Sequence, residues 1–480
     1  MLSTTARAIA DVTGGRLVSG ATGEEQVTGA ARVDSRAVGV GDLFAAFDGE
    51  RVDGHDYVAA AADAGAAIAL VSRDIGLPGI LVDDVETALS VLAHAQLEQA
   101  RAQGEVTVVA LTGSAGKTST KDLLGAMLAA EGPTIAPRGS FNNELGLPLT
   151  VLGLDEATRF LVLEMGARGI GHISHLTDIA RPDIALALNV GSAHLGEFGS
   201  VDAIAQAKGE IVEALGSNGR AVLNASDPRT RAMAERSPAT VVLWGSPDAA
   251  VRAEDVRLDA SARAQFTLVV GEGMTALDGS AIPSARVDVR LGLVGEHQVD
   301  NALAATAAAL LAGADLGRIV DALTVAQPLS GQRMEVTELP DSITLINDAY
   351  NANPDSMRLA LRTLAHLGRE RRTIAVLGEM RELGEDSVRL HDEIGRLVVR
   401  LNIDQLIVVG EGARPLHNGA FLEGSFGGES VHVATIDDAL AVLETTMRPG
   451  DVVMLKSSRD AGVRDLGPRI IDVVTRKGRA

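Results

Sequence analysis

Short aliphatic runs alternate with stretches of helical periodicity through the middle of the chain. The runs cover 106–111, 160–164, 184–190 and 220–224, and a Gly-rich turn and a helical stretch over 117–130 follow the first of them. Apolar runs of this length, bounded by turns, are typical of buried strands. Their alternation with helices predicts a mostly parallel sheet that is covered by helices, which is an α/β arrangement.

Two further runs, 265–270 and 285–291, are separated by a stretch that carries Gly, Asp and Pro, and this spacing predicts a hairpin. The helical stretch that follows, 299–311, is almost entirely Ala and Leu. A helix that is apolar on all sides is usually buried, so we expect this one inside the unit.

The pattern starts again after the break at Gln327 and Pro328. Amphipathic helices separate four more aliphatic runs, which lie at 343–346, 373–377, 405–409 and 451–455. This alternation predicts a second doubly wound, Rossmann-like unit.

The first hundred residues have a different pattern, with a strand-like run at 80–82 and an Ala-rich helical stretch at 58–66. They predict a smaller α/β unit. Linker-like stretches near 103–105 and 327–330 then divide the chain. We expect three domains, at 1–103, 104–328 and 329–480.

Charge and composition narrow the classes of function. The 480 residues include 43 Lys and Arg against 64 Asp and Glu, for a net charge of −21, and the aromatic residues are 8 Phe, 2 Tyr and 1 Trp. This balance argues against binding to nucleic acid or to an anionic membrane. The chain has no Cys, which excludes disulfides, Cys-bound metals and thiol nucleophiles.

Targeting and membrane segments are not evident. The apolar segments 58–71 and 302–314 are shorter than the roughly 20 residues that cross a bilayer. Residues 1–16 lack the continuous apolar stretch of a signal peptide. We expect a cytoplasmic protein that does not insert into membranes, and a monomer.

The sharpest local signal is a Gly-rich turn between the first strand and the first helix of the middle unit. Its glycines let backbone N–H groups turn toward one point, the helix N-terminus adds a positive dipole, Lys117 supplies a full charge and the Thr118 hydroxyl suits Mg²⁺. A glycine six positions before Lys117 would fall at Leu111, so this is a short Gly-x-x-Gly-Lys-Thr form. The competing interpretation is a plain strand-to-helix turn with a surface lysine. We assign nucleotide binding to Thr112, Gly113, Ser114, Ala115, Gly116, Lys117, Thr118 and Ser119.

A carboxylate follows the next strand. Glu164 ends the run 160–164, so it lies at the carboxyl edge of the predicted sheet, where such sheets bind ligands. With Thr118 it would offer oxygen ligands to a nucleotide-bound Mg²⁺. The competing interpretation is a carboxylate that caps the next helix.

These motifs together resemble the Mur ligase family. The resemblance rests on the phosphate loop, on Asn-Asn-Glu-Leu-Gly-Leu-Pro at 142–148 and on Glu-Met-Gly at 164–166. Two motifs of the last unit, at 347–357 and 378–384, are similar to the branch of the family that adds D-alanyl-D-alanine. Matches run from Asp34 to Arg459, nearly the whole chain.

The resemblance implies an ATP-dependent ligase of peptidoglycan precursor synthesis. ATP would phosphorylate the terminal carboxylate of UDP-MurNAc-tripeptide, and the amine of D-Ala-D-Ala would attack the acyl phosphate. The products would be UDP-MurNAc-pentapeptide, ADP and phosphate. The sequence does not distinguish meso-diaminopimelate from lysine as the third stem residue.

The resemblance also implies roles for single residues around the nucleotide. His194 follows the strand 184–190 and would help bind a second Mg²⁺, although a lone His is more often structural. Lys208, otherwise a solvated lysine of a helix, would be carbamylated and serve as a metal ligand. The metal ligands would then be Thr118, Glu164, His194 and Lys208.

Further nucleotide contacts are implied outside the loop, at Asn142, Asn143 and Asn301. Asn301 would contact adenine; from sequence alone it could equally cap the buried helix. Its neighbour Gln298 stands where relatives have Asn, which leaves the role of Gln298 open. Across the domain junction, Arg333 would reach the transferring phosphoryl group, and Asp348 would bind the ribose or orient Arg333. A surface ion pair is the competing interpretation for these two.

For the other substrates, Ser35 and Arg36 would contact the UDP group, because a hydroxyl beside a guanidinium suits a pyrophosphate. Asn351, Asn353 and Lys456 of the last unit would bind substrate.

Three other classes of protein share some of these features. The diamino-acid-adding Mur ligases usually carry an Asp-Asn-Pro-Arg motif that is missing here, and folylpolyglutamate synthase lacks the 348–357 motif. A nucleotide-hydrolysing switch protein would leave the motifs of the last unit unexplained.

Overall fold

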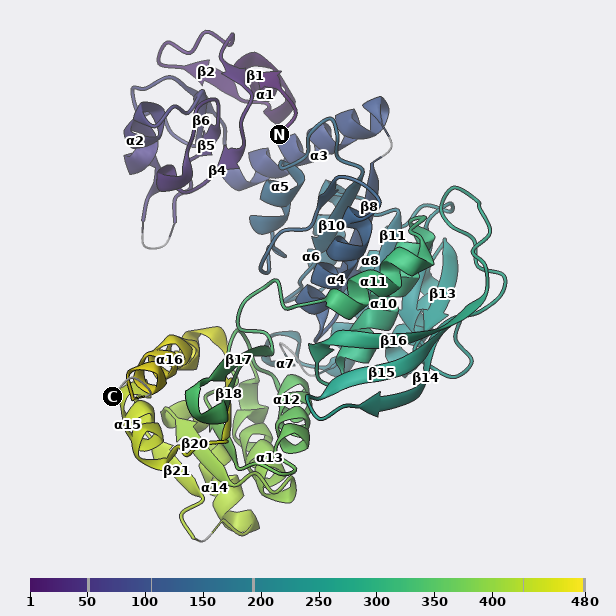
Figure 1. Ribbon diagram of the computed structural model, residues 1–480. Coiled ribbons are helices and arrows are strands. Elements are labelled where there is room, and N and C mark those ends of the chain that lie inside the picture. The colour runs from purple at the N-terminus through teal and green to yellow at the C-terminus, as the bar shows by residue number, and fades with distance from the viewer. Residues whose placement is uncertain (50–51, 105, 192–194, 426, 478–480) are drawn as a thin grey trace.

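The computed structural model describes residues 1–49, 52–104, 106–191, 195–425 and 427–477. Three α/β units follow one another along the chain (Figure 1). The N-terminal unit lies at one end of the molecule, the central unit in the middle and the C-terminal unit at the other end. The predicted α/β fold class is therefore confirmed.

The central unit is built on one large mixed sheet. Its described strands have the order β16-β15-β14-β13-β12-β11-β8-β10-β9, parallel from β9 to β14 and antiparallel from β14 to β16. The predicted hairpin is the β15–β16 pair. The strands are β8 (Thr107–Thr112), β9 (Thr134–Ile135), β10 (Phe160–Glu164), β11 (Ile184–Ala187), β12 (Arg220–Asn224), β13 (Thr240–Trp244), β14 (Val251–Leu258), β15 (Arg263–Val270) and β16 (Ala285–Val294).

The hydrophobic pattern did not predict β9, β13 or β14, and one predicted strand is too long. The run 184–190 is a strand only over 184–187, because residues 188–190 leave the sheet toward the phosphate loop, where Asn189 bonds to Ser114. β9 has only two residues, too few for a periodic signal. β14 carries charged residues on its exposed positions, which hides its apolar face.

Helices cover both faces of this sheet, because successive side chains of the parallel strands point to opposite sides. In β10, Leu161 and Leu163 face one core cluster, while Phe160 and Val162 face the other. The first cluster is closed by α5 (Gly146–Val151), α6 (His172–Ile179) and α8 (Val201–Glu213), and the second by α4 (Lys117–Ala129), α10 (Gln298–Leu311) and α11 (Leu316–Val325). Two short helices, α7 (Leu195–Phe198) and α9 (Pro228–Ala232), complete the unit. As predicted, α10 is buried along nearly its whole length.

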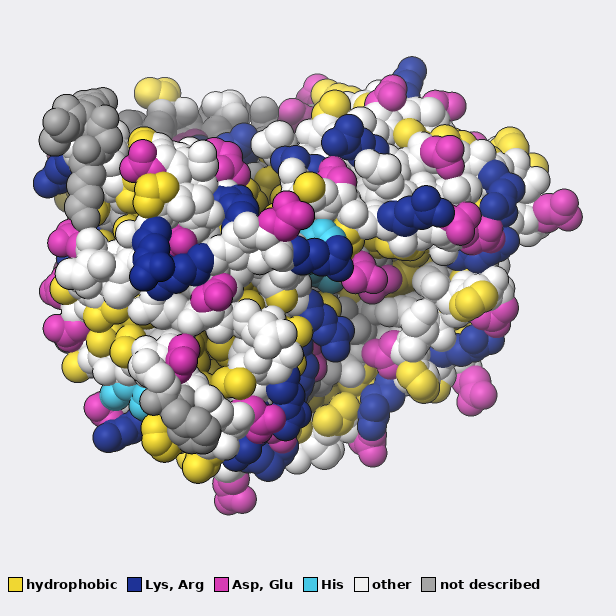
Figure 2. Space-filling view, turned by 60° about the horizontal axis from the view of Figure 1, so that its bottom comes forward, with side chains coloured by type: hydrophobic (Ala, Val, Ile, Leu, Met, Phe, Trp, Pro, Cys, Tyr) yellow, Lys and Arg dark blue, Asp and Glu magenta, His cyan; other side chains and the backbone are white. Residues whose placement is uncertain are grey.

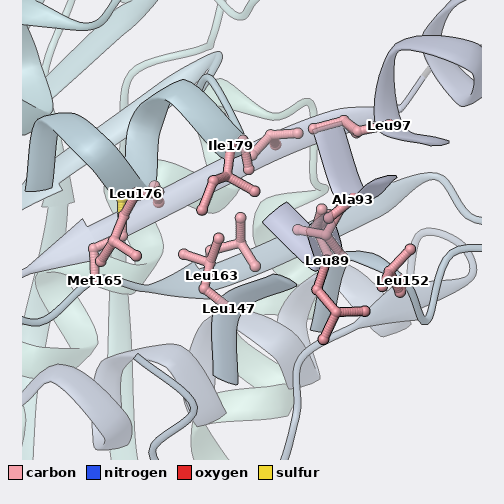
Figure 3. Close-up of a cluster of buried hydrophobic side chains, with 14 of the residues drawn as sticks. Leu89, Ala93, Leu97, Leu147, Leu152, Leu163, Met165, Leu176 and Ile179 are labelled. Atoms are coloured by element: carbon pink, nitrogen blue, oxygen red, sulfur yellow. The ribbon is translucent and has the colours of Figure 1, made fainter. Parts of the chain in front are cut away.

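The N-terminal and central units share apolar contacts. Helix α3 (Val85–Gln103) directs Leu89, Ala93 and Leu97 into a cluster with Leu163 of β10 and Leu147 of α5 (Figure 3). The last helix before residue 104 therefore packs against the middle sheet as well as against its own unit. The domain boundaries at 103 and 328 stay predictions.

The N-terminal unit has a five-stranded sheet in the order β2-β7-β6-β5-β4 and a separate β1–β3 pair. Two predictions here were slightly displaced: the helix expected over 58–66 is α2 (Val58–Asp63), and the strand expected at 80–82 is β7 (Gly79–Leu81). The other elements are β1 (Thr4–Thr5), α1 (Ala6–Thr13), β2 (Arg16–Val18), β3 (Gln26–Val27), β4 (Ala31–Arg32), β5 (Leu43–Ala45) and β6 (Ile68–Val71).

The C-terminal unit has a six-stranded sheet in the order β17-β18-β22-β19-β20-β21, parallel except for the edge strand β17. The second, Rossmann-like unit is confirmed. Its strands are β17 (Glu335–Leu339), β18 (Ile343–Asn347), β19 (Thr373–Leu377), β20 (Gln405–Val409), β21 (Ser430–Val433) and β22 (Val452–Lys456). Its helices are α12 (Pro354–Leu367), α13 (Ser387–Arg400), α14 (Arg414–Glu423), α15 (Ile436–Thr446) and α16 (Leu466–Lys477). Across the described ranges, no helix combines the length and apolar character that crossing a bilayer needs.

Candidate active site

A large cleft of about 1310 Å³ lies between the central and C-terminal units. The phosphate loop, the end of β10 and the start of α10 line it on the central side, and the segments after β18, β19 and β22 line it on the other. Figure 2 shows Lys and Arg side chains around a hollow near the middle of the face in view. The carboxyl ends of both parallel sheets thus meet at one site, as expected for open α/β sheets.

The phosphate loop joins β8 to α4 and is tightly built. Gly116 adopts φ +82°, and a side chain there would collide with the Asn301 amide. The half-buried Lys117 donates from Nζ to the Gly113 carbonyl at 2.8 Å. Burial lowers the pKa of Lys117, and the nearby Glu164 carboxylate partly opposes that effect. Lys117 is therefore not the surface lysine of the competing interpretation.

Asn189, which is not among the residues predicted from the sequence, holds this loop in place. Its Oδ1 accepts from the backbone N–H of Ser114 and of Ala115, at 3.0 and 2.9 Å, and its Nδ2 donates to the Ala115 carbonyl. The Ser114 hydroxyl in turn accepts from Gly191 N. The available signal was a polar residue inside the apolar run 184–190, which precedes His194.

Glu164 collects hydroxyl and amide donors. Its Oε2 accepts from the Thr118 hydroxyl at 2.7 Å, and its Oε1 accepts from Ser140 Oγ and Asn142 Nδ2, each at 2.7 Å. Burial raises the pKa of Glu164, but the charges of Lys117 and Arg333 and these hydrogen bonds outweigh burial and hold the pKa below its usual range. The carboxylate therefore stays ionised.

The helix-capping interpretation of Glu164 is wrong. The next helix, α6, begins after Gly171, and its free N–H groups at Gly171 and Ser174 are bound by Glu210. Glu164 instead faces the phosphate loop. Ser140, which the sequence motifs did not indicate, completes this group of polar side chains.

Lys208 is not a solvated lysine, contrary to its interpretation from sequence alone. It lies on α8, is only 3% exposed and lines the cleft. Burial lowers its pKa well below the ordinary value, and the charge of Lys117 adds to this effect. A neutral amine is the form that reacts with CO₂, so this burial suits carbamylation. His194 lies outside the described residues.

Arg333 reaches the cleft from the linker that joins the central and C-terminal units, residues 326–334 between α11 and β17. Its guanidinium lies over the ring of Tyr350, 4.1 Å from the centroid, and its buried Nε has no hydrogen-bond partner among the described residues. Arg459, 5.9 Å from the same ring, also lines the cleft. Tyr350 lies inside the 347–357 motif and Arg459 ends the stretch that resembles the family, but the sequence assigned a role to neither.

Asp348 does not pair with Arg333 directly. Its Oδ2 accepts from Lys456 Nζ at 2.5 Å, and its Oδ1 accepts from the backbone N–H of Met334 at 3.0 Å. Asp348 can therefore orient Arg333 only through the neighbouring backbone. The Asp348–Lys456 pair is buried, with side chains 14% and 3% exposed, so the surface ion-pair interpretation is wrong as well.

The other residues expected to bind substrate in this unit also make internal contacts. Lys456 donates to the carbonyls of Asp348 and Asn351, at 3.4 and 3.2 Å. Asn353 caps α12 and donates from Nδ2 to the Ser114 carbonyl at 3.3 Å, which joins the C-terminal unit to the phosphate loop. Asn351 lines the cleft.

Asn301 is not an N-cap, because α10 already begins at Gln298. Its Nδ2 donates to Gln298 Oε1 at 2.8 Å, and its Oδ1 accepts from Thr120 Oγ1 at 3.3 Å. Beside it, the half-buried His297 lines the cleft, and desolvation lowers its pKa to about 4, so it is neutral near pH 7. Asn143 lines the cleft too, while its Oδ1 accepts from Gly146 N.

Ser35 and Arg36 lie elsewhere. They belong to a short 3₁₀ turn, Ser35–Ala37, of the N-terminal unit and are not among the described residues that line the cleft. The Arg36 guanidinium is paired with Asp34 at 2.7 Å and remains largely exposed. The structure thus brings the nucleotide and C-terminal candidates together and leaves this pair apart.

A phosphate loop beside an ionised carboxylate, faced by an arginine from the linker to a second α/β unit, defines a nucleotide-dependent enzyme with a two-sided cleft. Comparison with models of known protein families shows which family of enzymes this is. The Mur ligase middle domain matches residues 111–309, the Mur ligase glutamate ligase domain matches 332–459, and the Mur ligase family catalytic domain matches 30–104. The chain belongs to the Mur ligase family.

Similar proteins share nearly the full length. UDP-N-acetylmuramoyl-tripeptide–D-alanyl-D-alanine ligase of Mycobacterium bovis is 45% identical, over 96% of each chain, and that of Escherichia coli is 32% identical, over 97% of this chain and 98% of the other. Among solved structures, MurF from Acinetobacter baumannii has a TM-score of 0.85 at 32% identity, covering 98% and 99%. MurF from Thermotoga maritima in complex with ADP has a TM-score of 0.78 at 27% identity, covering 94% and 99%.

Proposed function

We propose that the protein is the ATP-dependent ligase that adds D-alanyl-D-alanine to UDP-MurNAc-tripeptide in peptidoglycan precursor synthesis. The products are UDP-MurNAc-pentapeptide, ADP and phosphate. The observation that carries this proposal is the cleft itself, which brings Lys117 and Glu164 of the phosphate side into one space with Arg333 from the linker. The 45% identity to a ligase of that name supports the choice of substrates.

The chemistry follows from the residues of the two walls. A carboxylate acylates amines poorly, so its activation by phosphoryl transfer from ATP comes first, and the amine of D-Ala-D-Ala then displaces phosphate. Lys117 and Arg333 would bind the charge of the phosphoryl group, which is the main catalytic need of such a transfer. The C-terminal wall of the cleft limits the access of water to the acyl phosphate.

A divalent cation fits the polar group at Glu164. Hydroxyl and carboxylate oxygens of Thr118 and Glu164 are 2.7 Å apart, and hard oxygen ligands of this kind suit Mg²⁺. Thr118 and Glu164 would hold the ion, which neutralises phosphate charge when bound. We propose that His194 and Lys208, the latter as a carbamate, would hold a second ion.

For the adenine ring we propose a second pocket of about 500 Å³, which adjoins the cleft at Ser119, Gln298 and Arg333. Its other walls are mostly apolar and include Leu293 and Leu329. Gln298 lines both spaces, whereas Asn301 lines only the cleft and donates to the Gln298 amide oxygen. Asn301 would therefore act on adenine by fixing the Gln298 amide.

Substrate contacts complete the proposal. Ser35 and Arg36 would bind the UDP group, and the cleft wall at Asn351, Asn353 and Lys456 would position D-Ala-D-Ala. The internal bonds of Lys456 support a positioning role rather than direct contact. We propose that the enzyme acts in the cytoplasm as a monomer.

Phosphate release from ATP in the presence of UDP-MurNAc-tripeptide, with and without D-Ala-D-Ala, tests the function. We expect release to require both substrates and the product to be heavier by one dipeptide in mass spectrometry. Release that is indifferent to both substrates would refute the ligase and support a nucleotide-hydrolysing switch.

A further inference from the structure

Lys121 is the most completely buried lysine of the described chain outside the roles assigned above. It lies on α4, one turn after Thr118, and its side chain is 1% exposed. Its ammonium donates to the carbonyls of Pro137 and Gly139 and pairs with Asp122 Oδ1 at 2.9 Å. Three N–H donors thus meet three acceptors, so this buried cation is fully satisfied.

The two carbonyls belong to residues 136–142, the segment that follows β9 and contacts the Glu164 side chain. Residues 137–139 of this segment are in no described strand. Directly after them, Ser140 and Asn142 donate to the Glu164 carboxylate. Thr118 of α4 donates to the same carboxylate from the other side. Residues three apart on a helix are neighbours, so one face of α4 sets both sides of the Glu164 site.

The same segment is attached to the linker that carries Arg333. Gly139 N donates to Ser330 Oγ at 3.0 Å, and Ser330 N donates to Asp122 Oδ2 at 3.1 Å. Lys121 and Asp122 therefore contact the segment and the linker together. Ser330 is 5% exposed, so water competes little for these bonds.

A close helix contact supports this arrangement. Gly125, one turn further along α4, lies so near the segment that an added Cβ would be 2.5 Å from Ala136 Cβ. The absence of a side chain at Gly125 lets the segment lie directly against the helix. The segment is thus held by packing of Ala136 against Gly125, and by the Lys121 ammonium at the carbonyls of Pro137 and Gly139.

We propose that Lys121 is a positioning residue of the ligase reaction. With Asp122 it fixes both the segment that brings Ser140 and Asn142 to Glu164 and the linker that brings Arg333 to the opposite side of the phosphoryl group. The proposal rests on the function proposed above. Lys121 touches no reacting atom and acts through the residues it holds.

The test replaces Lys121 by Met, which keeps the length of the side chain and removes its donors. We expect the Mg²⁺ concentration for half-maximal ligase activity to rise about tenfold and kcat to fall by a similar factor, as for other residues that orient metal ligands. The KM for UDP-MurNAc-tripeptide should not change. Hydrogen–deuterium exchange, measured without substrates, should become faster in 137–142 and 330–334 but not in β10.

Arg220→Met provides a matched control. Arg220 is also a buried cation of the central unit that donates to backbone carbonyls, those of Asn218, Gly219, Thr275 and Ala276, but it lies outside the cleft. We expect this variant to lose thermal stability and keep the Mg²⁺ dependence of the wild type. If Lys121→Met, like Arg220→Met, keeps the Mg²⁺ dependence of the wild type and shows no faster exchange in 137–142 and 330–334, Lys121 is merely structural and the proposal is wrong.

Ser330→Ala covers the case in which Lys121→Met does not fold. It removes the acceptor of Gly139 N and leaves Lys121 in place, so the Mg²⁺ dependence should shift in the same direction by a smaller factor. An unchanged Mg²⁺ dependence with unchanged exchange in 137–142 would overturn the proposal. A wild-type protein without ligase turnover would instead refute the proposed function, while the exchange measurement would still report on Lys121.

Discussion

The two walls of the cleft use charge in different ways. On the central wall the charged groups bind neutral polar side chains or nearby backbone: Glu164 accepts three hydrogen bonds from hydroxyl and amide groups, and Lys117 donates to the Gly113 carbonyl. On the opposite wall Asp348 and Lys456 pair with each other, but Arg333 and Arg459 lie against Tyr350, and no carboxylate partner of either arginine is found in the described part of the chain. The central wall is therefore organised before any ligand binds, while the two arginines remain available to an anion.

This difference indicates a division of labour between the walls. Groups that are held in place lose little on binding and can stabilise charge without rearrangement. Arginines on an aromatic ring keep their donors for a ligand such as phosphate or carboxylate. Substitutions on the two walls should therefore have different kinetic signatures.

The largest effect is expected for Lys117→Ala on the central wall. Loss of this cation should lower kcat by about 10³-fold, the upper range for removal of one preorganised donor, while the fold survives. Steady-state phosphate release together with circular dichroism would measure both. Activity near that of the wild type in a folded variant would remove the argument from the phosphate loop.

A smaller loss is expected for Arg333→Lys on the other wall. Lysine keeps the charge but cannot reproduce the planar fork or the stacking on Tyr350, so kcat should fall by about 10²-fold. Binding of ADP should change much less than kcat, which equilibrium titration with a fluorescent nucleotide would show. Equal losses in both quantities would mean that Arg333 binds nucleotide without favouring the transition state.

Lys208→Ala tests the buried amine at the edge of the central wall. We expect a loss of about 10- to 100-fold, as for other residues near a bound metal, and partial rescue by short carboxylic acids. In the wild type, ¹³CO₂ NMR should show a carbamate. Because only the neutral amine reacts with CO₂, the carbamate signal should weaken as the pH falls and the amine takes up a proton. Absence of both adduct and rescue would leave Lys208 as a structural residue.

The smallest effect is expected for Arg36→Ala, far from both walls. Arg36 is exposed and paired with Asp34, so its removal should raise the KM for UDP-MurNAc-tripeptide only severalfold and leave kcat and the KM for ATP unchanged. Initial rates at varied substrate concentrations would show this. A fall in kcat with constant KM would contradict a role in binding the UDP group.

Much of the fold could be predicted from local pattern. The strands 160–164, 220–224, 373–377 and 405–409 have the bounds that their apolar runs predict, because buried parallel strands are apolar on both faces. The errors fall where burial is partial. β14 is half exposed and mixes charged with apolar residues, and β17 is an edge strand with Glu at both exposed positions.

The candidate site was predictable in its parts but not in its connections. The phosphate loop and Glu164 are adjacent to strands in sequence, so their place at the sheet edge follows from local order. The partner of Asp348, the support given by Asn189 and the burial of Lys208 involve residues that are distant along the chain. No local periodicity encodes such pairs.

The sequence by itself therefore determined the order of strands and helices, the phosphate loop and the family resemblance, since each depends on neighbouring residues. Only the tertiary structure decided which charges became buried and paired. In the sequence, Lys121 and Lys208 are both simply lysines of a helix. In the structure, two carbonyls and a carboxylate bind the Lys121 ammonium, whereas Lys208 lies buried at the cleft with a strongly lowered pKa. The physical reason is that desolvation and hydrogen bonding of a charge depend on what the packed chain brings around it.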